Sequence, residues 1–189
     1  MRNRYFGMRH GQSQANVEGI LVSNPEEGVR SYGLTPQGRK QVENAIRKNQ
    51  ILDSTCIIYS SEFLRAKESA EIVKDFFCIR KVNFHKNLRE RRFGSFDKKS
   101  LSNLQEIWKH DEQNANHSYK GVEPPTMVLA RVLLLVDLLE KRYSGRKILL
   151  VSHGDVLQIL HVHLLGMSAN LHRKITHLET AEIRELSSR

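Results

Sequence analysis

Residues 148–165 read ILLVSHGDVLQILHVHLL, an apolar run followed directly by Ser-His-Gly and then by a second apolar segment. The run at residues 148–151 is short, bounded and free of polar side chains, which is typical of a strand buried on both faces. Residues 156–165 have the length and apolar content of a helix packed against it. This stretch therefore predicts one strand–helix unit of an α/β sheet.

The same alternation of strand and helix patterns occurs along the rest of the chain. Further strands are predicted at residues 4–8, 56–59, 82–84 and 180–186. Further helices are predicted to begin at Thr35-Pro36, by the cap-then-proline signature, and to cover residues 62–77 and 127–143. The polar stretch 111–125 is predicted to be a surface loop. We expect a three-layer α/β fold with a mostly parallel central sheet flanked by helices.

Composition limits the class of protein. The 189 residues fit one domain, residues 1–189, and the formal charge of +9 favours anionic partners without separating phosphate esters from nucleic acid or acidic membranes. No apolar run reaches the ~18 residues of a membrane span or forms a signal-peptide core, so we expect a cytoplasmic protein without membrane contact. Cys56 and Cys78 lack the spacing of a zinc or redox site and are expected to be buried free thiols.

Three predicted strands run directly into unusual polar groups. These groups are Arg9-His10-Gly11 after residues 4–8, Ser60-Ser61 with Arg65 one helical turn later, and Ser152-His153-Gly154 after residues 148–151. Ligands of open α/β sheets bind beyond the carboxyl ends of the strands. We therefore expect two His and two Arg side chains to face one crevice.

Two guanidinium groups and two imidazoles together have the chemistry of a phosphate site. Guanidinium groups are permanently charged, bidentate donors to phosphate oxygens, and a neutral imidazole beside them can attack phosphorus to form a phosphohistidine. Gly11 and Gly154 lack a Cβ and are expected to let backbone amides approach the phosphate, while Asn16 can hydrogen-bond one of its oxygens. Glu90 is the candidate proton donor, because a bound phosphate dianion favours the acid form of a nearby carboxyl group.

Four separate motifs are distributed along most of the chain. They are Arg9-His10-Gly11 with Ser13 and Asn16, Arg65 after a strand, Leu88-Arg89-Glu90-Arg91 ahead of Phe93-Gly94, and Ser152-His153-Gly154. In this order they resemble the histidine phosphatase superfamily, the phosphoglycerate mutase-like proteins. The resemblance implies that His10 is the phosphorylated nucleophile and Glu90 the acid/base, without a metal or cofactor. It also implies a phosphate pocket formed by Arg9, Arg65 and His153, with Asn16 assisting.

Two departures from the family pattern limit what the resemblance transfers. Gln12 stands where many members have Glu, and Gly-Val-Glu-Pro at residues 121–124 replaces a Gly-Glu-Ser, so Glu123 receives no function. Only 62 residues separate Glu90 from His153, whereas cofactor-dependent mutases carry a longer insertion there. A shorter cap lets water in and favours a metal-independent phosphomonoester hydrolase that acts on a small phosphorylated metabolite. A mutase-type phosphoryl transfer and a phospho-ligand binding protein without turnover remain alternatives.

The remaining charged residues are interpreted as surface or packing features. The basic cluster comprises Arg89, Arg91, Arg92, Lys98 and Lys99. Because few aromatics interleave with it, we expect a solvated face that steers anionic substrates and no nucleic-acid partner. The later histidines, His161, His163, His172 and His177, are expected to be core or surface residues, not metal ligands. Specificity is expected to depend on loops 22–32 and 111–125, and no pattern selects one natural substrate or oligomeric state.

Overall fold

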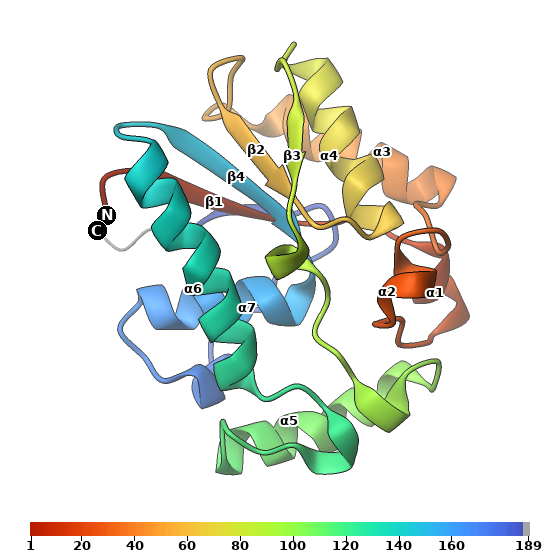
Figure 1. Ribbon diagram of the computed structural model, residues 1–189. Helices are drawn as coiled ribbons and strands as arrows, with labels where there is room; N and C mark the ends of the chain where they lie inside the picture. Colours follow the sequence, from red (N-terminus) through yellow and green to blue (C-terminus); the bar gives the residue numbers. More distant parts are fainter. Residues whose placement is uncertain (187–189) are drawn as a thin grey trace.

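The computed structural model describes residues 1–186, and at its centre lies a sheet with helices on both faces (Figure 1). The strands are β1 (Arg4–Arg9), β2 (Ile57–Ser60), β3 (Val82–Phe84), β4 (Lys147–Ser152) and β5 (Ile183–Glu185). Their order is β3-β2-β4-β1-β5, in which all neighbours pair in parallel except β5, which is antiparallel to β1. The predicted fold class is confirmed. The two ends of each predicted strand lie within three residues of the ends of an observed strand.

Helices α3 and α4 cover one face of the sheet, and α6 and α7 cover the other. The helices are α1 (Gln14–Glu18), α2 (Pro25–Gly28), α3 (Pro36–Lys48), α4 (Leu64–Phe76), α5 (Leu104–Gln113), α6 (Pro125–Arg142) and α7 (Gly154–Leu164). Short 3-10 turns are η1 (Lys86–Leu88), η2 (Gly94–Phe96), η3 (Leu101–Asn103), η4 (Tyr119–Gly121) and η5 (Ala169–Leu171). No helix in residues 1–186 is long and apolar enough to cross a bilayer.

The side chains of β4 show why its sequence requires helices on both sides. Ile148 and Leu150 pack in the cluster under α6 and α7, whereas Leu149 and Val151 pack in the cluster under α3 and α4. All four have no exposed surface. Successive side chains of a strand point to opposite faces, so four consecutive apolar residues need a core on each side.

Local sequence signals determine where helices α3 and α6 begin. The Thr35 side chain accepts a hydrogen bond from the Gly38 amide at 3.0 Å, and Pro36 follows at the first helical position, as predicted. Helix α6 starts at Pro125, two residues before the predicted start, since proline at the first position loses no helical hydrogen bond.

Two expectations about local structure are wrong. Stretch 111–125 is not wholly a surface loop, because α5 extends to Gln113 and Asp111 is completely buried. The apolar side of α5 packs with Phe93 and Phe96 in a third cluster, separate from the two clusters that cover the sheet. Residues 93–122 form a segment that we call the cap. Cys56 is buried as expected, but Cys78 is exposed.

Candidate active site

The parallel pairing of β1 with β4 brings the two histidines together. Arg9 and Ser152 are register partners, so His10 and His153 follow at the same edge of the sheet, where the His10 amide donates to the Ser152 carbonyl at 3.0 Å. The two imidazole centroids lie 5.2 Å apart. Residues 143 positions apart in the chain thus become neighbours, as the strand-end argument predicted.

The His10 imidazole is held as a neutral group with a defined tautomer. Its Nδ1 lies 2.7 Å from the Gly11 carbonyl oxygen, which can only accept, so the proton resides on Nδ1. Its Nε2 accepts from Arg65 Nε at 3.0 Å. Burial, and then the charges of Arg65 and Arg9, hold the pKa of His10 well below 6.5. Nε2 is therefore unprotonated at neutral pH, and its lone pair accepts from Arg65.

The two arginines keep unused hydrogen-bond donors in the site. Arg9 Nη1 donates to the Leu178 carbonyl at 3.0 Å and lies 2.7 Å from His177 Nε2. Burial lowers the pKa of Arg65 to about 10, which leaves it charged at neutral pH. Among the described residues, neither Arg9 Nε nor Arg65 Nη1 has a hydrogen-bond partner, although both are buried. Buried donors of this kind are costly unless a ligand accepts from them.

Glu90 lies between the second histidine and Arg65. Its Oε2 is 3.4 Å from His153 Nδ1 and 3.6 Å from Arg65 Nη2, and its Oε1 accepts from the Arg91 amide at 2.9 Å. Burial raises the pKa of Glu90 to about 7, against the opposing charge of Arg65. His153 Nε2 lies 2.9 Å from Ser61 Oγ, and burial keeps the pKa of His153 well below 6.5. The carboxyl group can thus hold or release a proton near neutrality.

Asn16 and the two glycines occupy distinct positions. Asn16 lines the pocket, but its Oδ1 accepts from the Ser13 amide and hydroxyl at 2.9 and 3.0 Å, in a capping box of α1. Gly154 also lines the pocket, and a Cβ there would meet no atom closer than 3.6 Å. A Cβ on Gly11 would come within 2.5 Å of the Gly38 carbonyl oxygen. Gly11 is therefore required by packing on α3, a different reason from the predicted approach of phosphate.

The sequence model of the histidine phosphatase superfamily (branch 1) matches residues 6–189. The chain belongs to this superfamily. The predicted family is thereby confirmed.

Similar proteins of this superfamily include phosphatases and a mutase. A probable phosphoglycerate mutase, GpmB of Salmonella paratyphi C (strain RKS4594), is 30% identical over 173 residues, which span 89% of this chain and 77% of that protein. The alpha-ribazole phosphatase of Shigella flexneri is 25% identical, with a TM-score of 0.76 over 95% of this chain and 88% of that one. A mycobacterial glucosyl-3-phosphoglycerate phosphatase, 24% identical, shares the fold with a TM-score of 0.77 over 96% and 88% of the two chains. The chain is a histidine phosphatase superfamily enzyme of phosphatase or mutase type.

The two positions that depart from the superfamily pattern make structural contacts. Gln12 Oε1 accepts from the Thr35 hydroxyl at 2.7 Å, which ties the loop after β1 to the start of α3. Glu123 Oε1 accepts from Arg131 Nε at 2.8 Å, and the Glu123 carbonyl accepts from Arg91 Nε at 2.7 Å. Both side chains therefore stabilise the chain segments around the site.

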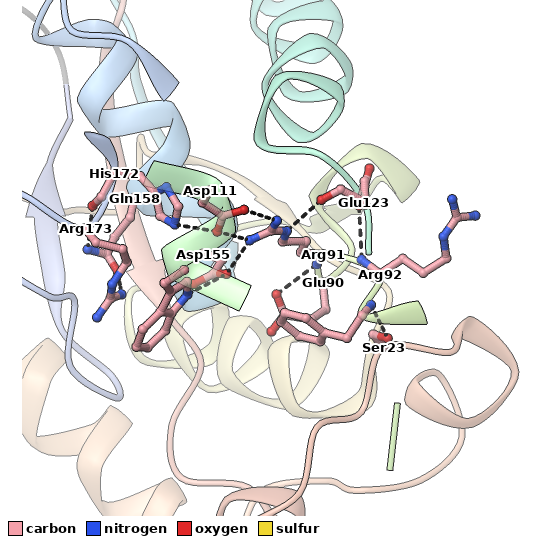
Figure 2. A network of polar contacts seen from close by, with 12 residues as sticks. Ser23, Glu90, Arg91, Arg92, Asp111, Glu123, Asp155, Gln158, His172 and Arg173 are labelled. Atoms are coloured by element: carbon pink, nitrogen blue, oxygen red, sulfur yellow. Dashed lines mark hydrogen bonds and ion pairs between the residues drawn. The ribbon is translucent and has the colours of Figure 1, made fainter. Parts of the chain in front are cut away.

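A buried ionic network centred on Arg91 joins the cap to this histidine phosphatase site (Figure 2). The Arg91 guanidinium makes a bidentate pair with Asp111 of α5, at 2.6 and 2.7 Å, and lies 3.2 Å from Asp155 Oδ2 at the start of α7. The interpretation of Arg91 as part of a solvated basic face is wrong, because it has no exposed surface. The network fixes the backbone that carries Glu90, and no local pattern marks it because its partners lie 20 and 64 positions away.

The pocket of the site encloses about 690 Å³, part of it open to solvent. Of the loops expected to set specificity, only Val22 contributes to its lining, and no described residue of 111–125 does. His177, Leu104 and Trp108 line it instead, and sequence reasoning missed all three. The sequence interpretation of His177 is a core or surface residue. Leu104 and Trp108 belong to α5, where Leu104, Ile107 and Trp108 recur at helical spacing, a period that indicates the helix but not the pocket that it lines.

Proposed function

We propose that the chain hydrolyses phosphate monoesters of small metabolites through a phosphohistidine on His10, without a metal ion. The observation that supports this proposal is a buried, neutral imidazole whose Nε2 lies beside two guanidinium groups with unpartnered donors, Arg9 Nε and Arg65 Nη1. A phosphate dianion supplies the acceptors that these donors lack, and the fixed positive charge stabilises its transition state.

In the first step, His10 Nε2 attacks phosphorus while the bond from phosphorus to the ester oxygen breaks. The Arg65 Nε donor, which contacts Nε2 in the free site, turns to a phosphate oxygen. Glu90, with a pKa of about 7, gives its proton to the departing oxygen, and an alcohol leaves. The Gly11 carbonyl, which accepts from Nδ1, stabilises the positive charge that develops on the ring.

In the second step, the ionised Glu90 takes a proton from water as that water attacks the phosphohistidine. The bond from phosphorus to Nε2 breaks, inorganic phosphate leaves, and both His10 and the Glu90 proton are restored. Arg9 and Arg65 hold the phosphoryl oxygens throughout.

The test compares hydrolysis of p-nitrophenyl phosphate in excess EDTA by wild type and by His10→Ala. The variant is expected to lose activity on the order of 10³-fold or more, and to lose the acid-labile phosphoenzyme trapped from labelled substrate. His163→Ala, an exposed change on α7, is the matched control and keeps both. Full activity in His10→Ala refutes the nucleophile, and loss of wild-type activity in EDTA refutes metal independence.

The likeness to a probable phosphoglycerate mutase favours one second candidate, phosphoryl transfer between hydroxyls. The short segment between Glu90 and His153 supports hydrolysis instead, because less chain encloses the intermediate. A coupled isomerase assay with and without a bisphosphate primer separates the two, since only the mutase depends on the primer. Tight phosphate binding without any phosphoenzyme would identify a binding protein without turnover.

A further inference from the structure

Beside Arg9, His10 and Arg65, the pocket is bounded by an apolar wall from two parts of the chain. The wall consists of Ile20, Leu21, Phe93, Leu101, Leu104 and Trp108. Leu21 and Phe93 are buried members of the cap's own hydrophobic cluster, against which Leu101 and Leu104 pack. One side of the pocket therefore presents hydrocarbon and an indole ring.

The wall is fixed before any ligand binds. The Leu21 amide donates to the Lys99 carbonyl at 2.9 Å, and the Lys98 amide donates to the Leu21 carbonyl at 2.7 Å, so the two chain segments form a short ladder. Trp108 Nε1 donates to Asp155 Oδ2 at 3.3 Å, and the Arg173 guanidinium stacks 3.7 Å from the indole centroid. A surface held in this way loses little conformational freedom when a ligand covers it.

The charges around the pocket disfavour a second anionic group on the ligand. Arg9 and Arg65 are the two Lys or Arg side chains among its described lining residues, and the proposed reaction uses both for phosphate. The acidic side chains that line it are Glu90 and Asp155. Burial lowers the pKa of His177, so this histidine is neutral at neutral pH. Arg173, which stacks on the Trp108 indole and donates to Gln158 Oε1 at 2.6 Å, does not itself line the pocket. Apart from the two arginines that bind phosphate, the lining therefore offers a carboxylate of the leaving group only apolar carbon, neutral polar groups and the carboxyl groups of Glu90 and Asp155.

We infer that the preferred substrates are phosphate monoesters of uncharged, apolar alcohols or phenols, whose chain or ring lies on the apolar wall. This inference depends on the proposed hydrolysis, which supplies the phosphate end of the same pocket. Burying apolar carbon stabilises the complex in proportion to the area removed from water.

The test is the hydrolysis of ethyl, butyl and hexyl phosphate, followed by release of inorganic phosphate. Their leaving alcohols have nearly equal acidity, so differences in kcat/KM report contact with the wall. We expect kcat/KM to rise about fourfold per methylene, which corresponds to about 0.8 kcal/mol for each buried methylene. Hexyl phosphate with a terminal carboxylate is expected to react at least about tenfold more slowly than hexyl phosphate.

Two variants test whether the gain in kcat/KM per methylene comes from the apolar wall. Leu104→Ala is expected to reduce the gain per methylene, while Leu138→Ala, an exposed leucine on α6 outside the pocket, keeps the wild-type gain. If Leu104→Ala does not fold, the wild-type series alone decides. A flat series, or preference for the carboxylated ester, overturns the apolar wall as a binding surface while hydrolysis itself stands. Absence of hydrolysis of all esters, p-nitrophenyl phosphate included, refutes the proposed function instead.

Discussion

Replacing Glu90 with glutamine is expected to stabilise the protein at alkaline pH and to slow its reaction. Burial raises the pKa of this carboxyl group from 4.5 to about 7, so the folded state retains a proton that the unfolded chain has released. Because the folded pKa is raised, the stability from this proton is present below pH 4.5 and is lost as the pH rises through 7. Glutamine stays neutral at every pH and avoids that loss.

The size of this stability loss follows directly from the shift in the pKa of Glu90, since the side chain is only 12% exposed. Each pKa unit corresponds to about 1.36 kcal/mol, so the free energy of unfolding of wild type should fall by about 3 kcal/mol relative to Glu90→Gln between pH 4.5 and pH 8.5. Urea unfolding of both proteins at several pH values measures this difference, and the other titrating groups cancel. Glu26→Gln, an exposed change of the same chemistry, is the control and follows wild type. A wild-type-to-variant difference that does not change with pH refutes the reasoning.

In the proposed reaction, the same group also sets the pH dependence of the activity. The first step needs the acid form of Glu90, so kcat/KM is expected to fall about tenfold per pH unit above pH 7. Glu90→Gln is expected to lose about 10²-fold to 10⁴-fold in rate for alkyl esters and to lose the descending limb. An unchanged descending limb in the variant would assign it to another group.

Three further outcomes test the packing of the fold. Asp111→Asn leaves a buried guanidinium without its main carboxylate, and urea unfolding is expected to show a loss of about 3–5 kcal/mol. Gly38→Ala would place a Cβ into the Gln12 carbonyl oxygen, so a loss of at least about 1–3 kcal/mol is expected, whereas the exposed Gln37→Ala changes little. Burial raises the pKa of the Cys56 thiol to about 12. One thiol, that of Cys78, is therefore expected to react with a disulfide reagent in the native protein and two after unfolding.

Much of the fold was predictable because its signals are local. Side-chain alternation identified β4 as a strand buried on both faces, and Thr35 with Pro36 marked the start of α3 through contacts within one turn. Position at a strand end likewise predicted that His10 and His153 would meet, because parallel strands share one carboxyl edge. The antiparallel β5 shows the limit, since its pairing with β1 depends on a partner far away in the chain.

The sequence by itself determined the layers of this protein, the family to which it belongs and the strand ends at which its polar groups lie. Only the tertiary structure decided the electrostatics and the walls of the pocket. Arg91 belonged to a basic run in the sequence, yet distant carboxylates neutralise it in the interior, and burial by many segments sets the protonation of His10 and Glu90. The physical reason is that secondary structure depends on neighbours along the chain, whereas desolvation and charge pairing depend on neighbours in space.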